Sequence, residues 1–348
     1  MELNLLQSAA QFRIKDFSLS NQLLVANPYP YQDKIRQEDL IHYSKMYGGS
    51  WLLFNYDDVK ALLTDPRLTN DRSVLPLMTL PEEERAQFND MIPVLSKWLA
   101  FFDGHQHLQR WQRLDRSCPP LLSRSTLNGV IHDAAEDLVN AWHDLESIDL
   151  IADFARPLPA MVITRLLGGA DDDHEKLARW SDDIAYLFGA SDLTVDDVKR
   201  GQVSLHAFND YLQNLAIEAM KPGREDMILS RLMSQSGKGF QFDMESAAAQ
   251  CMLLMFAGLE PTRYLVGNAV WALRQHPEQR QTLTEDLEQL PLAILPYVGA
   301  AYRDPTVFEH PDTLDIRRSP NRHLSFGVGP HACIGATLVR QQAQMALS

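Results

Sequence analysis

The chain has 348 residues, of which 45% are hydrophobic, and a formal net charge of -14. That is enough apolar material for one large domain or two, and the acidic balance argues against nucleic acid and anionic membrane surfaces as main partners. The three cysteines, Cys118, Cys251 and Cys333, are far apart in the sequence. Their spacing argues against a disulfide framework or a structural zinc site and fits a reducing compartment.

The start of the chain does not read as a targeting or membrane segment. Residues 1–17 mix charged with apolar side chains and lack the unbroken apolar stretch of a signal peptide. No window approaches about 18 apolar residues without charge, so we expect no membrane span. We expect a cytoplasmic protein.

Strand signals are few and helical signals are long. Residues 50–54 (Ser-Trp-Leu-Leu-Phe) are the best strand candidate, followed by a turn at 55–58 and a helix at 59–64. Apolar residues recur with helical spacing at 127–145, 154–167, 173–188 and 203–220. Pro157 and Pro159 stand near the start of the second of these helices, where proline is best tolerated.

The longest helical pattern covers residues 243–275. Its middle, residues 251–257, is apolar on all sides, which is typical of a buried central helix. The chain has no repeat of 20 to 50 residues and no low-complexity linker, and residues 236–239 (Ser-Gly-Lys-Gly) are typical of a loop. We therefore predict one domain over residues 1–348, mainly α with a small β-sheet.

The most informative segment is residues 326–335, Phe-Gly-Val-Gly-Pro-His-Ala-Cys-Ile-Gly. Glycine lets a backbone approach a flat ligand and adopt left-handed dihedral angles without a Cβ clash. The apolar spacing of Ile334, Leu338 and Val339 predicts a helix after Cys333. The sulfur would then lie near a helix N-terminus, where the helix dipole favours a thiolate. A buried cysteine in a glycine-rich turn is the simpler alternative.

This loop resembles the haem-binding loop of the cytochrome P450 family. The resemblance implies a haem b cofactor with the Cys333 thiolate as iron ligand, since a thiolate pushes electron density onto haem iron and favours O–O cleavage. His331 could pair with a haem propionate. The matching positions are Phe326, Gly327, Gly329, His331, Cys333 and Gly335.

The resemblance covers nearly the full chain, and the bacterial, soluble members are the closest type. It implies the P450 fold, mainly α with a small sheet. The other matching segments follow in the family's order: residues 51–58, 63–67, 149–155, 157–159, 166–168 and 301–305, with Phe308, Pro311, Asp312 and Asp315 after them.

In this family the stretch 257–262 crosses the distal face of the haem. The resemblance implies that Ala257 and Gly258 open a groove for O2 and that Glu260 is the acid that relays protons. The usual hydroxyl position is Pro261, and Thr262 is rotated from it by about 100°. Pro261 should kink the helix, which could re-aim Thr262 or leave a carbonyl free to bind water. The alternative is a structural kink with a surface glutamate.

A second stretch, residues 103–111, resembles the family's propionate-binding helix. His107 matches a propionate partner, whereas the family's arginine is replaced by Trp111, with Arg110 next to it. Surface polarity is the alternative for His107, and the better interpretation of His105. An exposed basic patch on the cysteine side would mark an acidic redox partner, and Arg110, Arg113, Arg116 and Arg340 are its candidates.

Two parts of the family pattern are missing, so we expect a truncated form of the fold. Residues 287–299 hold no Glu-x-x-Arg pair, and residues 294–298 look like the last of the family's pocket strands without the earlier ones. The C-terminal hairpins do not follow Cys333. Either the protein is naturally shortened, with altered or lost activity, or segments of the whole protein are missing from this chain.

Three functions fit this pattern. The first is a monooxygenase for a small, largely apolar substrate in specialised metabolism, with electrons from NAD(P)H through a ferredoxin and a reductase. No flavin or nucleotide motif supplies them in this chain. The second is a haem-thiolate peroxygenase, dehydratase, isomerase or cyclase, which the proline at position 261 favours. The third is a non-catalytic binding protein. We expect pocket residues from the ranges 73–102, 182–190 and 255–262.

Overall fold

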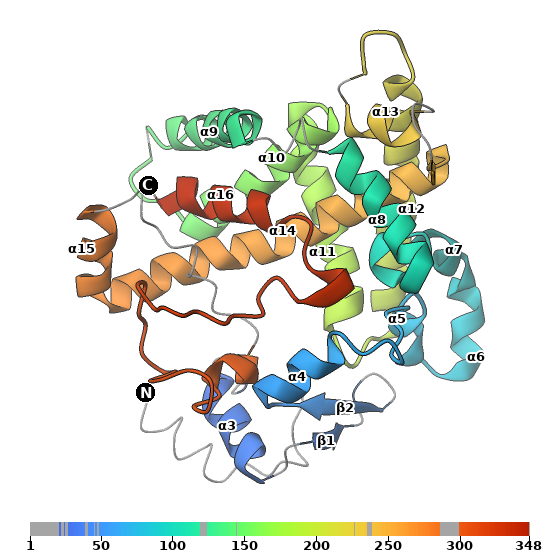
Figure 1. Cartoon of the computed structure of the whole chain (residues 1–348). Helices are drawn as coiled ribbons and strands as arrows, with labels where there is room; N and C mark the ends of the chain where they lie inside the picture. The colour runs from blue at the N-terminus through green and yellow to red at the C-terminus, as the bar shows by residue number, and fades with distance from the viewer. Residues whose placement is uncertain are drawn as a thin grey trace.

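Figure 1 shows the computed structural model of the chain, in which helices dominate. The structure describes residues 21, 24, 27–38, 41–44, 46, 49–118, 124–143, 145–225, 227–234, 239–285 and 299–347. Within these ranges the only sheet has two strands. The predicted fold class, mainly α with a small sheet, is confirmed. The predicted strand at 294–298 lies outside the described residues.

The N-terminal part combines helix α3 (Tyr29–Glu38), strands β1 (Ile41–Ser44) and β2 (Ser50–Leu53), and helix α4 (Tyr56–Leu62). The strands are antiparallel, with Tyr43 opposite Trp51. The predicted strand is β2, and its partner β1 is too short to give a clear alternation signal. Helix α4 begins earlier than predicted, because Asn55 is still extended and two acidic residues follow in the first turn, where the helix dipole favours them.

Short helices connect this part to the helical body. They are α5 (Leu75–Met78), α6 (Glu82–Arg85), η3 (Ala86–Met91), α7 (Ile92–Leu95) and η4 (Leu99–Phe101), followed by the longer α8 (Gly104–Ser117). Proline stands in the first turn of α5 and of α7, where its missing N–H costs no hydrogen bond.

The predicted amphipathic segments form the helical body, and all four are helical in the structure. Its elements are α9 (Arg124–Asn140), the π-helical turn η5 (Ile151–Ala155), α10 (Pro157–Leu167), η6 (Asp171–Asp173), α11 (His174–Gly189), α12 (Val195–Ala219) and α13 (Ile228–Met233). Helix α12 begins at Val195, ahead of the predicted residue 203. Thr194 and Asp197 form a capping box there, a signal that apolar periodicity alone does not detect.

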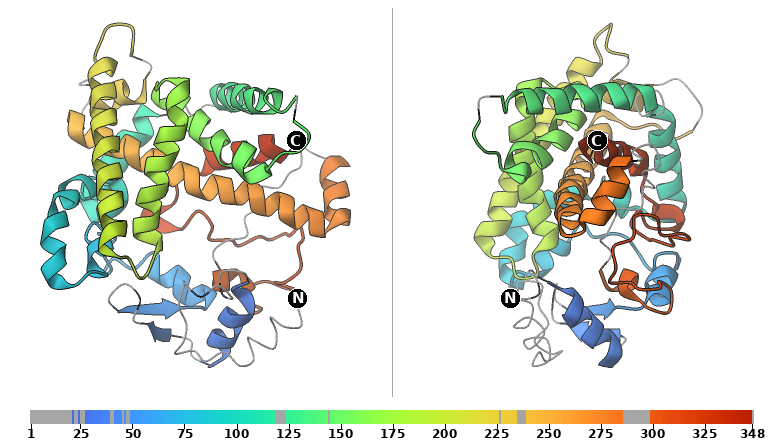
Figure 2. Two further views of the ribbon diagram at one scale, coloured as in Figure 1. Left: turned by 180° about the vertical axis from the view of Figure 1, so that it is seen from behind. Right: turned by 90° about the vertical axis from the view of Figure 1, so that its left-hand side faces the viewer.

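Helix α14 (Met244–Gln275) is the predicted central helix, and it continues through Pro261. It crosses the molecule in both figures and packs against α10, α11, α12 and α16. The chain then forms α15 (Pro277–Glu285), η8 (Gly299–Arg303), η9 (Gly329–His331) and α16 (Ala336–Leu347), which lies beside α14 (Figure 2). None of the described helices is long and apolar enough to cross a membrane.

Segments far apart in the sequence meet below α14. The carboxylate of Asp304 accepts a hydrogen bond of 3.1 Å from the backbone N–H of Tyr56, and the Tyr56 hydroxyl donates one of 2.7 Å to the carbonyl of Arg322. Tyr56 also packs with Phe308 and Leu324 in a small core. These contacts attach the segment leading to Cys333 to the start of α4. That one domain covers residues 1–348 stays a prediction.

We predict that Gln250→Ala lowers the free energy of unfolding by about 2–4 kcal/mol, because it leaves buried backbone groups without partners. The fully buried Gln250 amide accepts a 2.9 Å hydrogen bond from the Leu99 N–H and donates one to the Lys97 carbonyl, which ties η4 to α14. Urea unfolding measures the loss. Gln112→Ala, at an exposed helical site, is the matched control; equal effects would show that the Gln250 bonds add nothing.

Candidate functional site

The loop around Cys333 is held by its own backbone. The Cys333 N–H donates to the carbonyl of Phe326 over 2.7 Å, and the Gly327 N–H donates to the carbonyl of Leu324 over 2.7 Å. Gly327 and Gly329 have φ angles of +67° and +75°, which non-glycine residues rarely adopt. The predicted glycine-dependent turn is therefore present, and it leaves Cys333 as a free, exposed thiol.

Gly329 is also a point of close approach to the end of α4. A Cβ atom built on it would lie 2.9 Å from Cγ2 of Thr64 and 3.5 Å from the carbonyl oxygen of Leu63. A side chain would be strained both by the φ angle and by this contact. Gly335 stands on the other side of the cysteine, and a Cβ there would lie 3.8 Å from the Cys333 sulfur. The loop thus keeps bulk away from the sulfur.

The helix that the sequence predicts after Cys333 is present in the structure. Helix α16 does follow, beginning at Ala336. Although the residue as a whole is exposed, the protein atoms packed around its sulfur raise the pKa of Cys333, and this outweighs the opposing effects of the Gly335 N–H and the Arg340 guanidinium. A metal ion bound to this sulfur would favour its ionised form.

Two histidines predicted from separate motifs lie side by side. The ring centroids of His107, on α8, and His331, in the cysteine loop, are 4.0 Å apart. Asp103, which precedes α8, lies with Oδ1 3.6 Å from Nε2 of His331, and it is held by hydrogen bonds from Thr69 and Asn70. His107 is buried, whereas His105 is exposed, as the surface interpretation of His105 predicted.

Burial lowers the pKa of His107 to about 4, with His331 acting in the same direction and Asp103 opposing. Burial likewise lowers the pKa of His331, against the raising effect of Asp103. Both imidazoles are therefore neutral near pH 7 in the protein alone. An anionic group that reached them would favour their protonated forms and gain a charge-assisted hydrogen bond.

The candidate basic patch is only partly exposed. Arg113 is buried, and its guanidinium donates to the carbonyls of Arg231, Leu232 and Ser234 at the end of α13, so it does not belong to an exposed patch. Arg110 lies over the ring of Phe102, 3.8 Å from the centroid. The two remaining candidates differ in exposure: Arg116 is exposed, whereas Arg340 is half-buried over the ring of Phe326.

Ala257 and Pro261 lie on an exposed side of α14, and Thr262 does not. Thr262 is fully buried, and its hydroxyl has no hydrogen-bond partner. The proline therefore does not re-aim Thr262 toward the exposed side. Gly258 faces α10, since a Cβ on it would lie 2.3 Å from Cδ1 of Ile163. In this structure the glycine permits close helix packing, and a groove for O2 at Ala257 and Gly258 stays a prediction.

Glu260 belongs to a chain of charges that sequence reasoning missed. A guanidinium nitrogen of Arg263 lies 2.5 Å from its carboxylate, close but not aligned as a hydrogen bond. Arg263 also donates to Asp182 of α11 over 2.6 Å, and Asp182 accepts from Arg156 over 2.8 Å. Burial raises the pKa of Glu260, and Arg263 opposes that rise. Only the spacing of Glu260 and Arg263, three residues apart, is visible in the sequence.

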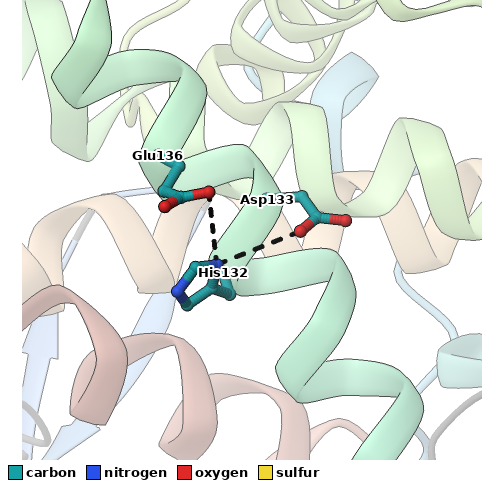
Figure 3. Close-up of side chains that lie close together, drawn as sticks. All are labelled: His132, Asp133 and Glu136. Atoms are coloured by element: carbon teal, nitrogen blue, oxygen red, sulfur yellow. Dashed lines mark ion pairs between the residues drawn. The ribbon is translucent and has the colours of Figure 1, made fainter.

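Two further features lie outside the predicted site. A cavity of about 270 Å³ lies between α9, η5, α10 and α11, with Trp142, Arg156 and His174 in its lining. Figure 3 shows His132, Asp133 and Glu136 together on α9. Nδ1 of His132 lies 3.9 Å from Asp133 and 3.6 Å from Glu136, and all three side chains are exposed. Surface pairs of this kind contribute about 0–1 kcal/mol.

Comparison with known proteins places this geometry in context. No protein-family model matches the chain. The polyketide biosynthesis cytochrome P450 PksS of Bacillus subtilis is 28% identical over 92% of this chain and 86% of its own length. The vitamin D(3) 25-hydroxylase of Pseudonocardia autotrophica is 30% identical over 92% of this chain and 85% of its own. The crystal structure of P450BioI with an acyl carrier protein carrying hexadec-9Z-enoic acid matches with a TM-score of 0.80 and 26% identity, over 94% and 91%.

We predict that Arg263→Met makes stability depend more steeply on pH. The raised pKa of Glu260 stabilises the fold at low pH, and this contribution is lost as the pH rises through that value. Without Arg263 the pKa rises further, so the variant should lose about 1–2 kcal/mol more near pH 8 than near pH 5, after allowance for solvent screening. Urea unfolding across this range measures the difference.

The double variant Arg263→Met/Glu260→Gln is the control, because it removes the group that titrates. Its stability should depend on pH less steeply than that of Arg263→Met, and no more steeply than that of the parent, in which Glu260 still titrates. An unchanged pH dependence in Arg263→Met itself would contradict the role given to this ion pair.

Proposed function

The chain belongs to the cytochrome P450 family, and we propose that it is a haem-thiolate monooxygenase for a small, largely apolar substrate. The observation that carries the proposal is the exposed thiol of Cys333 in a loop shaped by left-handed glycines. Relatives named as a monooxygenase and a hydroxylase favour it over a haem enzyme that does not use O2 and over a non-catalytic binding protein.

The residues present fit a haem, and we propose haem b. Cys333 supplies a soft thiolate ligand, and Gly335 keeps a side chain away from its sulfur. The neutral pair His107 and His331 is suited to receive propionates. Phe326 belongs to the same loop as Cys333, and Arg110 on α8 is a further cation. On the distal side Ala257 stands on the exposed side of α14, and Gly258 next to it permits the close packing of α10.

When bound, the group supplies an iron centre at which O2 is activated for insertion of one oxygen atom into the substrate. The residues of the chain hold and orient the group. The loop fixes the sulfur through the Cys333 N–H and the carbonyl of Phe326, and Gly335 offers an N–H to the sulfur, which tunes the electron density there. His107 and His331 orient the group through its carboxylates.

Glu260 supplies protons on the distal side in this proposal. Its raised pKa makes it easier to protonate near neutral pH than an ordinary glutamate, and Arg263 limits that rise. Pro261 occupies the hydroxyl position and lies next to it on the exposed side of α14. Thr262, the remaining candidate for a catalytic residue, takes no part in proton transfer, because its side chain is fully buried.

We propose an acyl or polyketide-like substrate from specialised metabolism. One relative is named for polyketide biosynthesis, and the structural match P450BioI was crystallised with a fatty-acyl carrier protein. Electrons would come from a ferredoxin and a reductase, since the sequence shows no flavin or nucleotide motif. A cytoplasmic location stays a prediction; it rests on the sparse, widely spaced cysteines.

We predict that the reduced protein with carbon monoxide gives a strongly red-shifted Soret band, and that Cys333→Ser abolishes the shift because a hydroxyl group is a much poorer donor than a thiolate. Cys118→Ala is the matched control, since that cysteine is buried at the end of α8. A red-shifted band that survives in Cys333→Ser would overturn the ligand assignment.

We predict that Glu260→Gln slows O2-dependent turnover by about 10²-fold while the substrate dissociation constant stays nearly constant, because the amide cannot deliver a proton. Glu245→Gln, in the exposed first turn of the same helix, is the control. Spectral titration measures substrate binding, and product formation measures turnover. Equal losses in both would remove Glu260 from proton delivery.

A further inference from the structure

Pro261 changes the backbone of α14 beside the proposed site. In a helix the N–H of each residue donates to the carbonyl four residues earlier, so the carbonyl of Ala257 would receive its bond from residue 261. Proline has no N–H. Helix α14 nevertheless continues without interruption from Met244 to Gln275. The Ala257 carbonyl oxygen has therefore lost its usual helical donor, although the helix around it is intact.

The Ala257 carbonyl lies on the exposed side of α14. Ala257 and Pro261 are one turn apart on α14, and both are exposed. The nearest side-chain hydroxyl on the helix, that of Thr262, is fully buried on another side. On this side the backbone thus supplies an acceptor oxygen that has no helical donor. The side-chain hydroxyl that follows on the same side, that of Tyr264, lies beside the Arg263 guanidinium at 3.0 Å.

We propose that the Ala257 carbonyl oxygen takes the place of the missing hydroxyl group and holds a water molecule that passes protons from Glu260 into the site. This inference rests on the proposed monooxygenase function. The water donates one hydrogen bond to the carbonyl, and its oxygen accepts the proton from the Glu260 carboxyl group as it releases another toward the substrate side. The carboxylate left behind regains a proton from solvent, so the number of protons balances.

The charges around Glu260 support this role. Its side chain is 18% exposed, enough for contact with solvent, and the close Arg263 guanidinium is not aligned as a hydrogen bond. Arg263 is also held by Asp182 and lies beside the Tyr264 hydroxyl at 3.0 Å. The arginine therefore fixes the carboxyl group in place without using all of its hydrogen-bonding capacity.

Two substitutions of Pro261 distinguish the role of the Ala257 carbonyl from that of a side-chain hydroxyl. Pro261→Ala restores an N–H, closes the helical bond to Ala257 and adds no hydroxyl. Pro261→Thr restores the same N–H and adds a hydroxyl. Both residues are compatible with a helix, and Pro261→Ala should raise the Tm of the haem-free protein. We expect Pro261→Ala to lower product formed per O2 consumed by about tenfold, and Pro261→Thr to match or exceed the parent.

A second readout does not depend on turnover. The infrared stretching frequency of carbon monoxide bound to the reduced protein falls when a water molecule donates a hydrogen bond to it. We expect this frequency to rise in Pro261→Ala and to stay low in the parent and in Pro261→Thr. If Pro261→Ala matches the parent in both measurements, the water-holding carbonyl is wrong. If the parent itself gives no red-shifted Soret band, the proposed function fails first and this inference with it.

Discussion

Close packing of α14 against the helices around it decides where the site can be. Gly258 and Gly267 face Ile163 of α10 and Ile151 of η5, and a Cβ on either glycine would lie 2.3 or 2.5 Å from the isoleucine Cδ1. At both glycines an isoleucine side chain packs directly on the backbone of α14. With that side committed to packing, the side of Ala257 and Pro261 is exposed, and it is there that we propose the chemistry. The same contacts explain why Thr262, one position further along, has no access to it.

The cysteine loop is positioned by contacts with α4, not by the helices that pack against α14. Gly329 contacts the end of α4, and the chain leading to the loop is bonded to Tyr56 through Asp304. The sulfur is thus placed by helix α4 and the residues just after it, whereas Glu260 is placed by the helical body. His107 and His331 join the two parts, because one comes from α8 and the other from the loop.

Features that depend on neighbouring residues in the sequence were predictable, and contacts between residues far apart in the sequence were not. The left-handed glycines, the helix after Cys333 and the central helix follow from residue types and apolar spacing. The rotation of Thr262 away from position 261 follows from helix geometry. The pairing of Glu260 with Arg263 and Asp182 depends on how α11 packs against α14, and the capping role of Arg113 depends on where α13 ends. Neither is encoded in a local pattern. The raised pKa of Cys333 depends on which atoms surround the sulfur in the folded chain, and a local pattern does not show them.

The hydrogen bond between Tyr56 and Asp304 has a consequence for how the protein forms. The two residues are 248 positions apart, so the core around Tyr56 cannot close until most of the chain has left the ribosome. The packing of α10, α11 and α12 is local by comparison and can form during synthesis. The sulfur therefore reaches its final place late, and the slow step in folding should be the capture of the N-terminal helix and strands by the C-terminal segment.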